Sequence, residues 1–169
     1  MDITIREAQP GDAAQIITYV NHLSKEPESN LEISPGEFTY TEKEEADILA
    51  GFAASPNSLF LVAEIGGKIV GMLNCKGSPR AAIRHAVTLG ISVDRVWRRQ
   101  GVGTQLLENA IAWARKSGLV SRIELSVFER NSTAIHLYEK FGFDVEGKRR
   151  RAVFRDGTYL DTLLMALLL

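Results

Sequence analysis

Hydrophobic residues recur along this chain at spacings that change between those of helices and those of strands. Ile16, Val20 and Leu23 lie three or four residues apart, as on one face of a helix, whereas residues 3–6 alternate between apolar and polar as in a strand. The same pattern predicts further strands at 58–64, 68–75, 82–93, 122–128, 143–155 and 159–168, and helices at 13–23, 41–54, 102–117 and 131–141.

Local signals for turns and helix ends divide these elements. Thr41 and Glu44 are spaced as a capping box, and Gly66-Gly67 and Asp156-Gly157 are dipeptides typical of tight hairpins. Strands flank each of the last two helices, which favours crossovers to parallel strands there, while the hairpins make other pairs antiparallel. The order β-α-α-β-β-β-α-β-α-β-β therefore predicts an α/β (α+β) fold with a mixed, mostly antiparallel central sheet and helices on both faces, in one domain over 1–169.

Composition and charge exclude several classes of protein. The chain has 169 residues, 45% of them hydrophobic, and a formal net charge of −1, so it can bury a core and has no basic excess for nucleic acid. One cysteine, Cys75, and three scattered histidines offer no metal-ligand spacing. The N-terminus is charged, unlike a signal peptide, and the apolar run 163–169 is far shorter than the roughly 20 residues that span a bilayer. We expect a cytoplasmic protein that binds neither metal nor membrane.

A segment with two glycines, between a predicted strand and a predicted helix, is the first candidate for chemistry. Gly101 and Gly103 allow a ligand to approach the main chain closely, and the first N–H groups of the following helix have no partner within it. Arg98 and Arg99 add positive charge, so the segment predicts an anion site. A turn that only packs the helix against the strand would look the same, and the spacing matches neither GxGxxG nor a P-loop.

Two motifs resemble those of the GNAT superfamily of N-acetyltransferases. Arg98-x-x-Gly101-x-Gly103 is similar to the family signature Gln/Arg-x-x-Gly-x-Gly/Ala, which binds the pyrophosphate of coenzyme A. Residues 131–143, NSTAIHLYEKFGF, resemble the later motif Asn-x-x-Ala-x-x-Leu-Tyr-x-x-x-Gly-Phe. Both occur in the family's order, and the resemblance spans nearly the whole chain. It implies a GNAT-like sheet, acetyl-CoA as cofactor and transfer of its acetyl group to a primary amine.

The resemblance also implies roles for individual residues. The backbone around Ile91 and Val93 would pair with the pantetheine arm, and an N–H near Leu89 would stabilise the developing oxyanion. A phenol of pKa about 10 can protonate a leaving thiolate of pKa about 8.5, so Tyr138 is predicted to be the general acid. The predicted cofactor-binding residues are Ile91, Ser92, Val93, Arg98, Arg99, Gln100, Gly101, Val102, Gly103, Thr104, Asn131, Ala134 and Tyr138.

The general base is open at this stage. Many relatives carry a glutamate on the fourth strand, near the position of Thr88 in this chain, and threonine cannot act as a base. The candidates are His85 at the start of that strand, Glu124 on the next strand and Glu32 in a loop. His85 alternates in phase with its strand and could equally be a packed or edge histidine. A chain of water molecules without a single base is a further alternative.

The acceptor is predicted only as a class. The polar segment 24–37 is a long loop for a compact domain, which favours a substrate-facing role. We expect a small-molecule amine. The alternatives are a protein N-terminus or lysine, a non-catalytic CoA-binding module, or a protein that uses the loop for another phosphate ligand. The apolar last strand could complete the sheet or pair across a homodimer.

Two further features have structural interpretations. The basic run Lys148–Arg151 is predicted to be a charged edge strand with Arg149 and Arg151 on one face, although an acidic partner is an alternative. Cys75 is predicted to be a small buried apolar residue rather than a nucleophile.

Overall fold

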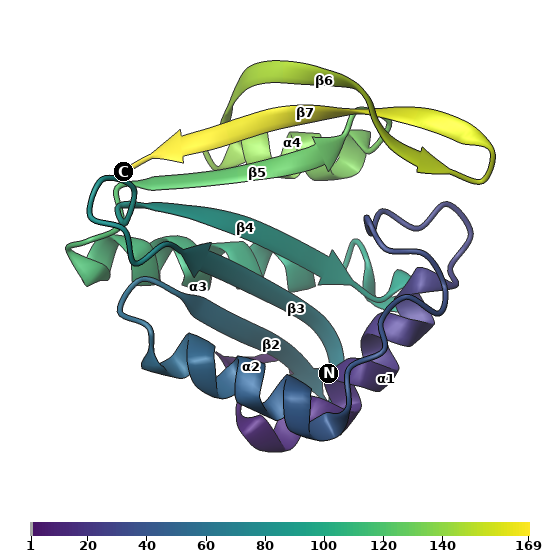
Figure 1. Ribbon diagram of the computed structural model, residues 1–169, viewed down its shortest axis with the longest axis horizontal. Coiled ribbons are helices and arrows are strands. Elements are labelled where there is room, and N and C mark those ends of the chain that lie inside the picture. The colour runs from purple at the N-terminus through teal and green to yellow at the C-terminus, as the bar shows by residue number, and fades with distance from the viewer. Residues whose placement is uncertain (1) are drawn as a thin grey trace.

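The computed structural model describes residues 2–169 and is built around a seven-stranded sheet of order β1-β2-β3-β4-β5-β7-β6 (Figure 1). The strands are β1 Thr4–Glu7, β2 Leu59–Ile65, β3 Lys68–Gly77, β4 Ala86–Val93, β5 Arg122–Phe128, β6 Asp144–Arg155 and β7 Thr158–Leu168. The helices are α1 Ala13–Ser24, α2 Glu42–Ala54, α3 Val102–Ser117 and α4 Ser132–Lys140, with short 3-10 turns at Pro10–Asp12 and Arg95–Trp97. Helices and strands follow one another in the predicted order.

The sheet is mostly antiparallel, as predicted. Only β4 and β5 pair in parallel among the described strands, and α3 supplies the crossover between them. Their pairing covers only Ala86–Thr88 against Arg122–Glu124, and the two strands then separate (Figure 1). The predicted parallel pairing after α4 is wrong. The β6–β7 hairpin folds back so that β7 lies beside β5, and β6 takes the edge.

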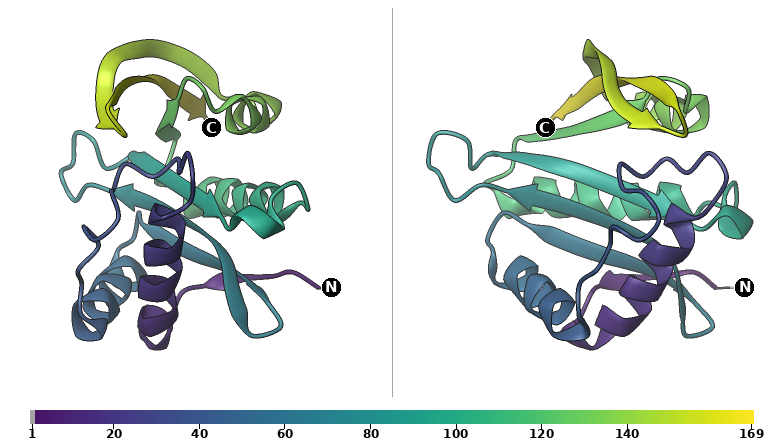
Figure 2. Two further views of the ribbon diagram at one scale, coloured as in Figure 1. Left: turned by 90° about the vertical axis from the view of Figure 1, so that its right-hand side faces the viewer. Right: turned by 45° about the vertical axis from the view of Figure 1, so that its right-hand side comes forward.

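Helices cover both faces of the sheet, as the sequence predicts. On one face α1 and α2 pack on β2 and β3 through a cluster that includes Ile16, Leu49 and Val62. On the other face α3 and α4 pack on the remaining apolar side chains, with Leu106 and Ile123 fully buried (Figure 2). Burial of each such side chain contributes roughly 1.5–3 kcal/mol, so these two layers hold the ends of the strands in place.

The predicted turns and caps are confirmed. Gly66 and Gly67 have φ values of 58° and 80°, and Asp156 and Gly157 have 49° and 74°, as type I′ hairpins require. Thr41 accepts a hydrogen bond of 3.2 Å from the Glu44 N–H in the predicted capping box. No helix among residues 2–169 is both long and apolar enough to cross a bilayer.

One predicted boundary is wrong. The strand expected at 82–93 begins only at Ala86, because residues 80–85 form turns, with Ile83 N–H donating to Arg80 O at 3.0 Å. Ile83 is 48% exposed there, so its apolar side chain belongs to a turn and not to the sheet. His85 consequently lies before the strand.

Candidate active site

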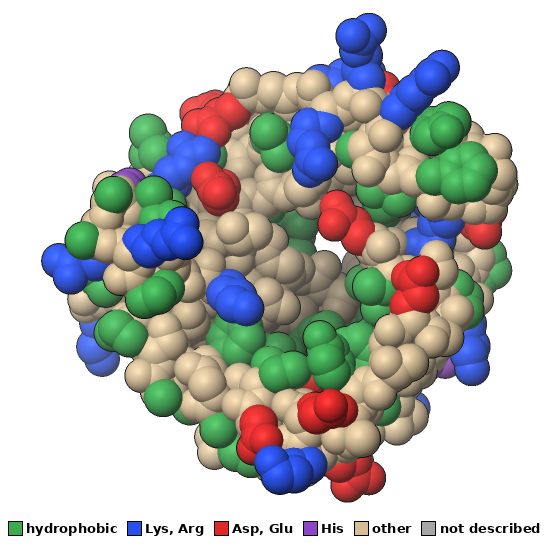
Figure 3. All heavy atoms as spheres, in the orientation of Figure 1, with side chains coloured by type: hydrophobic (Ala, Val, Ile, Leu, Met, Phe, Trp, Pro, Cys, Tyr) green, Lys and Arg blue, Asp and Glu red, His purple; other side chains and the backbone are tan. Residues whose placement is uncertain are grey.

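A cavity of about 710 Å³ opens where β4 and β5 separate. Residues 88–93 of β4 and 126–128 of β5 line it, together with residues from the start of α3, from α4 and from the loop after α1. Figure 3 shows this face of the molecule hollowed near its centre, with hydrophobic side chains along the edge of the hollow. A volume of this size is typical of a small-molecule site, for which about 300–1,000 Å³ is usual.

The separation of the strands leaves main-chain groups of β4 without a neighbouring strand. The Asp94 N–H donates to Val70 O at 2.9 Å, which shows that the main-chain groups of Ser92 and Gly90, two and four residues earlier, also point towards β3. Because hydrogen bonds alternate in direction along an antiparallel strand, the main chain of Ile91 and Val93, beyond the pairing of β4 with β5, points the other way, into the gap. An extended ligand that carries amides can pair there as an added strand would.

The segment from Arg98 to Thr104 lies at one end of the cavity. Gly101 is the N-cap of α3 and has φ of 86°, a conformation that favours glycine. Gly103 has no such φ, and a Cβ there would lie 3.5 Å from Leu137 Cδ2, at ordinary contact distance. Gly101, Gly103 and Thr104 line the cavity, so the free N–H groups and the positive end of the α3 dipole form an anion site.

The two arginines of this segment differ in role. Arg98 donates its Nε to Val93 O at 2.8 Å and pairs with Glu26 at 2.5 Å. The Glu26 side chain is only 6% exposed, so Arg98 braces the segment against the chain that follows α1. Arg99 and Lys140 also line the cavity, and they supply positive charge near its anion site.

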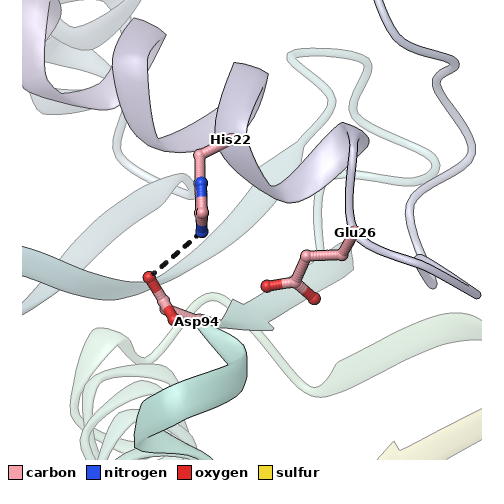
Figure 4. Close-up of side chains that lie close together, drawn as sticks. All are labelled: His22, Glu26 and Asp94. Carbon is pink, nitrogen blue, oxygen red and sulfur yellow. Dashed lines mark ion pairs between the residues drawn. The ribbon is translucent and has the colours of Figure 1, made fainter.

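His22, Glu26 and Asp94 lie together behind this segment, with potential ligand atoms within 4.8 Å of one another (Figure 4). His22 Nε2 is 3.7 Å from Asp94 Oδ2. The Glu26 oxygens accept from Arg95 N–H and from the guanidinium described above, and Asp94 Oδ1 accepts from Val96 N–H. Because these oxygens are already bonded, the cluster joins α1 to the turn after β4 and is a poor metal site.

The helix α4 brings three residues of the second motif to the cavity. Asn131 caps the helix by accepting the Ala134 N–H at 3.3 Å, and Asn131, Ala134 and Tyr138 all line the cavity, as their helical spacing predicts. The Tyr138 ring packs against Phe143 with centroids 5.7 Å apart, and the residue is 5% exposed. Burial raises the pKa of Tyr138, so the phenol keeps its proton over a wide pH range.

Of the three candidates for a base, the structure brings only Glu32 to the cavity. Glu32 lines the cavity from the loop after α1, where it is exposed. His85 is exposed in the turn before β4 and is not among the described residues that line the cavity. Glu124 accepts a hydrogen bond of 2.8 Å from Arg122 and is also outside the lining. Thr88, near which the resemblance implies a glutamate in many relatives, does line the cavity.

Two predicted cofactor contacts do not reach the cavity with their side chains. The Gln100 amide donates to Val96 O at 2.8 Å, and Val102 is 1% exposed within the core. These two residues can contribute only main-chain groups. Ile91, Ser92 and Val93 do line the cavity, and Ser92 Oγ is 3.1 Å from the Tyr19 hydroxyl.

Another part of the cavity wall contains residues that the motifs did not indicate. Leu23 of α1 and Met72 and Asn74 of β3 line the cavity, together with residues 29–32. A Cβ at Gly90 would lie 3.6 Å from the Asn74 amide, so the missing side chain at Gly90 leaves room above that amide. A polar residue at position 74 between buried neighbours is the one signal in the sequence that could have indicated this wall.

The basic run does not alternate as predicted. The register of β6 shifts between Arg149 and Val153, and Arg151 has φ of 52°, so a bulge interrupts the run. Lys148 lies 3.1 Å from Asp161, whose carboxylate also accepts the Arg151 N–H at 2.8 Å. This part of β6 is held to β7 by charge-assisted hydrogen bonds.

Cys75 is a residue of β3 whose side chain belongs to the hydrophobic core, and it is not among the described residues that line the cavity. It is 0% exposed, and burial raises the pKa of its thiol to about 12. The thiol therefore stays protonated, in agreement with the predicted structural role.

Both the sequence and the structure are similar to those of known acetyltransferases. Residues 25–143 match the acetyltransferase (GNAT) family. An L-amino acid N-acetyltransferase of Escherichia coli (strain K12) is 38% identical over 114 residues, which are 68% of this chain and 70% of that protein.

Solved structures give the same fold. The crystal structure of an acetyltransferase of the GNAT family from Streptococcus pneumoniae superposes with a TM-score of 0.95 at 35% identity and covers 99% of both chains. A GNAT superfamily phosphinothricin acetyltransferase from Sinorhizobium meliloti, solved in complex with acetyl-CoA, has a TM-score of 0.85 at 22% identity and covers 100% of this chain and 89% of that one. At this identity the second likeness establishes the fold alone.

Proposed function

Because this chain belongs to the acetyltransferase (GNAT) family of acyl-CoA-dependent N-acyltransferases, we propose that it acetylates the amine of a small molecule, with an amino acid as the first candidate. The E. coli relative named above is an L-amino acid N-acetyltransferase. The N-terminus of α3 suits a phosphate-bearing cofactor. The part of the cavity lined by Leu23, Met72, Asn74 and residues 29–32, here named the acceptor end, suits a compact amine.

Acetyl-CoA fits the chemistry of the cavity wall at the start of α3. The N-terminus of α3 would hold the pyrophosphate, with Arg99 and Lys140 nearby as further positive charge. The main chain of Ile91 and the N–H of Val93, which lie beyond the pairing with β5, would pair with the amides of the pantetheine arm. When bound, acetyl-CoA supplies an activated thioester, and the residues of this chain orient it.

Three groups of this chain would move charge and protons. A main-chain N–H of β4 near Leu89, where the strand leaves β5, would donate to the oxygen that becomes negative as the amine attacks. Tyr138 would give its proton to the departing sulfur, because burial keeps the phenol neutral. Glu32, directly or through water, would attract the ammonium form of the acceptor and take its proton.

One observation carries the proposal of a small acceptor. Residues 29–32, which line the acceptor end, are held against the β6–β7 hairpin by hydrogen bonds from Arg155 to Ser29 O and Leu31 O. The loop after α1 therefore forms a fixed wall of the cavity, which favours a compact acceptor over a polypeptide chain. Leu23 and Met72 line the enclosed space with apolar atoms, which suits a compact amine with an apolar side chain.

An acceptor screen tests the proposal. Free CoA thiol is measured with acetyl-CoA and a panel that contains free amino acids, polyamines, and peptides with a free N-terminus or lysine. We expect turnover with amino acids. Turnover with peptides alone would indicate that the acceptor is a protein and not a small molecule. Tight acetyl-CoA binding without turnover on any amine would favour a non-catalytic CoA-binding module.

A further inference from the structure

Arg155, at the end of β6, is a buried cation bonded to a distant loop. Its side chain is 8% exposed. The guanidinium donates to Ser29 O and Ile33 O at 3.0 Å, to Ser24 O at 3.4 Å, and to Leu31 O. All four carbonyls belong to the end of α1 or to the loop after it. Figure 1 shows that loop beside the turn of the β6–β7 hairpin, although the two are far apart in sequence.

Two of the four bonded carbonyls, those of Ser29 and Leu31, belong to the segment that lines the acceptor end of the cavity. Residues 29–32 all line it, and Ser29 is only 3% exposed. On the basis of the proposed function, we infer that Arg155 is a positioning residue that fixes the acceptor-binding segment 29–32 and so sets the affinity for the acceptor amine.

The chemistry of the loop explains why an arginine is needed. Residues 25–41 form neither helix nor strand, so their buried carbonyls must find partners outside regular structure. A guanidinium carries five N–H donors in one plane and can bond several carbonyls at once, whereas a lysine places three donors on a single atom. Loss of the Arg155 side chain would remove the hydrogen-bond donor from several carbonyls of the loop at once.

The charge of Arg155 is satisfied mainly by these carbonyls. The Asp156 carboxylate is 4.0 Å from Arg155 Nε and its side chain is 85% exposed, so it neutralises the cation only weakly. Arg130 reaches Ser29 O at 3.4 Å and Glu28 O at 3.5 Å, which are longer contacts to the same segment. The closely bonded Arg155 is therefore the main link between the hairpin and the acceptor end.

The test compares Arg155→Gln and Arg155→Lys with Arg150→Gln, which removes the same charge from an exposed position on the same strand. Kinetics are measured with each substrate varied in turn. In Arg155→Gln we expect kcat/KM for the amine to fall about a hundredfold, as for a displaced binding group. The KM for acetyl-CoA should stay within about twofold, because the anion site is untouched. Arg155→Lys should recover only part of the loss, and Arg150→Gln should resemble the wild type.

Hydrogen–deuterium exchange gives a readout that does not depend on turnover. Amides of residues 25–37 should exchange faster in Arg155→Gln than in Arg150→Gln, while those of α3 should not change. Three results in Arg155→Gln would each overturn the inference: equal losses of kcat/KM for the amine and for acetyl-CoA, an unchanged KM for the amine, or an unchanged exchange rate of the amides of residues 25–37. If Arg155→Gln does not fold, Arg155→Lys undergoes the same comparison. If the wild type acetylates no amine, the proposed function fails, and the exchange rates alone decide whether Arg155 holds the segment.

Discussion

Gly103 and Leu137, which both line the cavity, lie close together, and a Cβ at Gly103 would lie 3.5 Å from Leu137 Cδ2. The protein itself therefore has room for a small side chain at this position. A long acidic side chain would instead enter the anion site. We predict that Gly103→Glu abolishes acetyl-CoA binding, measured by isothermal titration calorimetry, and leaves the melting temperature close to that of the wild type.

Two variants serve as controls for this prediction. Gly103→Ala should fold normally and weaken binding far less than Gly103→Glu, because its methyl group fits beside Leu137. Gly101→Ala should lose stability by about 1 kcal/mol or more, because φ at Gly101 is 86°. Retained affinity in Gly103→Glu would show that the pyrophosphate lies elsewhere.

Tyr138 is predicted to be the general acid. Tyr138→Phe removes only the hydroxyl from a ring that packs against Phe143, so the fold should persist. We expect kcat to fall by about 10²–10⁴-fold, the usual size of such a contribution. Tyr19→Phe is the matched control, since Tyr19 is also buried but is not among the described residues that line the cavity. A kcat in Tyr138→Phe equal to that of the wild type would remove Tyr138 from the mechanism.

The pH profile tests the same residue in another way. The neutral phenol is the form that donates a proton, and burial raises the pKa of Tyr138 above its usual value. Activity should therefore rise with pH as the acceptor amine loses its proton, and should not fall between about pH 8 and about pH 10. Steady-state rates across this range would settle the point, and an alkaline decline absent from Tyr138→Phe would contradict it.

The periodic spacing of apolar residues in the sequence was sufficient to predict most of the fold. The helix α3 and the strand β5 each bury one regular set of apolar side chains, and their predicted bounds agree with the structure. Position 83 misled the prediction, since an apolar residue in a turn looks the same as one in a strand. The acceptor wall could not be foreseen. Leu23 and Asn74 line the cavity from α1 and β3, and the cavity between β4 and β5 forms only through pairing between distant segments.

Mutation can distinguish Glu32 from the other two candidates for the general base. We predict that Glu32→Gln lowers kcat/KM for the amine by at least about tenfold near neutral pH, where the acceptor is mostly an ammonium ion. The loss should shrink at higher pH, because the amine then needs no base. Glu124→Gln is the matched control, since Glu124 is bonded to Arg122 outside the cavity lining. Equal rates for both variants at every pH would favour proton transfer through water alone.

The Asp12 carboxylate should stabilise the fold in a pH-dependent way. Arg6 donates to both of its oxygens at 2.8 and 2.9 Å, and the Gln9 N–H donates at 2.7 Å. The Arg6 hydrogen bonds, and secondarily that from Gln9, hold the pKa of Asp12 below its usual 3.8. A lowered pKa in the folded state contributes stability that is complete above 3.8 and is lost as the pH falls below it.

We therefore predict that Asp12→Asn costs about 2 kcal/mol in the free energy of unfolding near pH 7, and that this difference from the wild type narrows towards pH 3. Urea unfolding at several pH values measures both quantities. Asp47→Asn is the control, because the Asp47 side chain is 66% exposed and its ion pair with Lys43 should contribute little. A difference between Asp12→Asn and the wild type that stays constant from neutral to acid pH would mean that the charge of Asp12 is not what stabilises this corner of the fold.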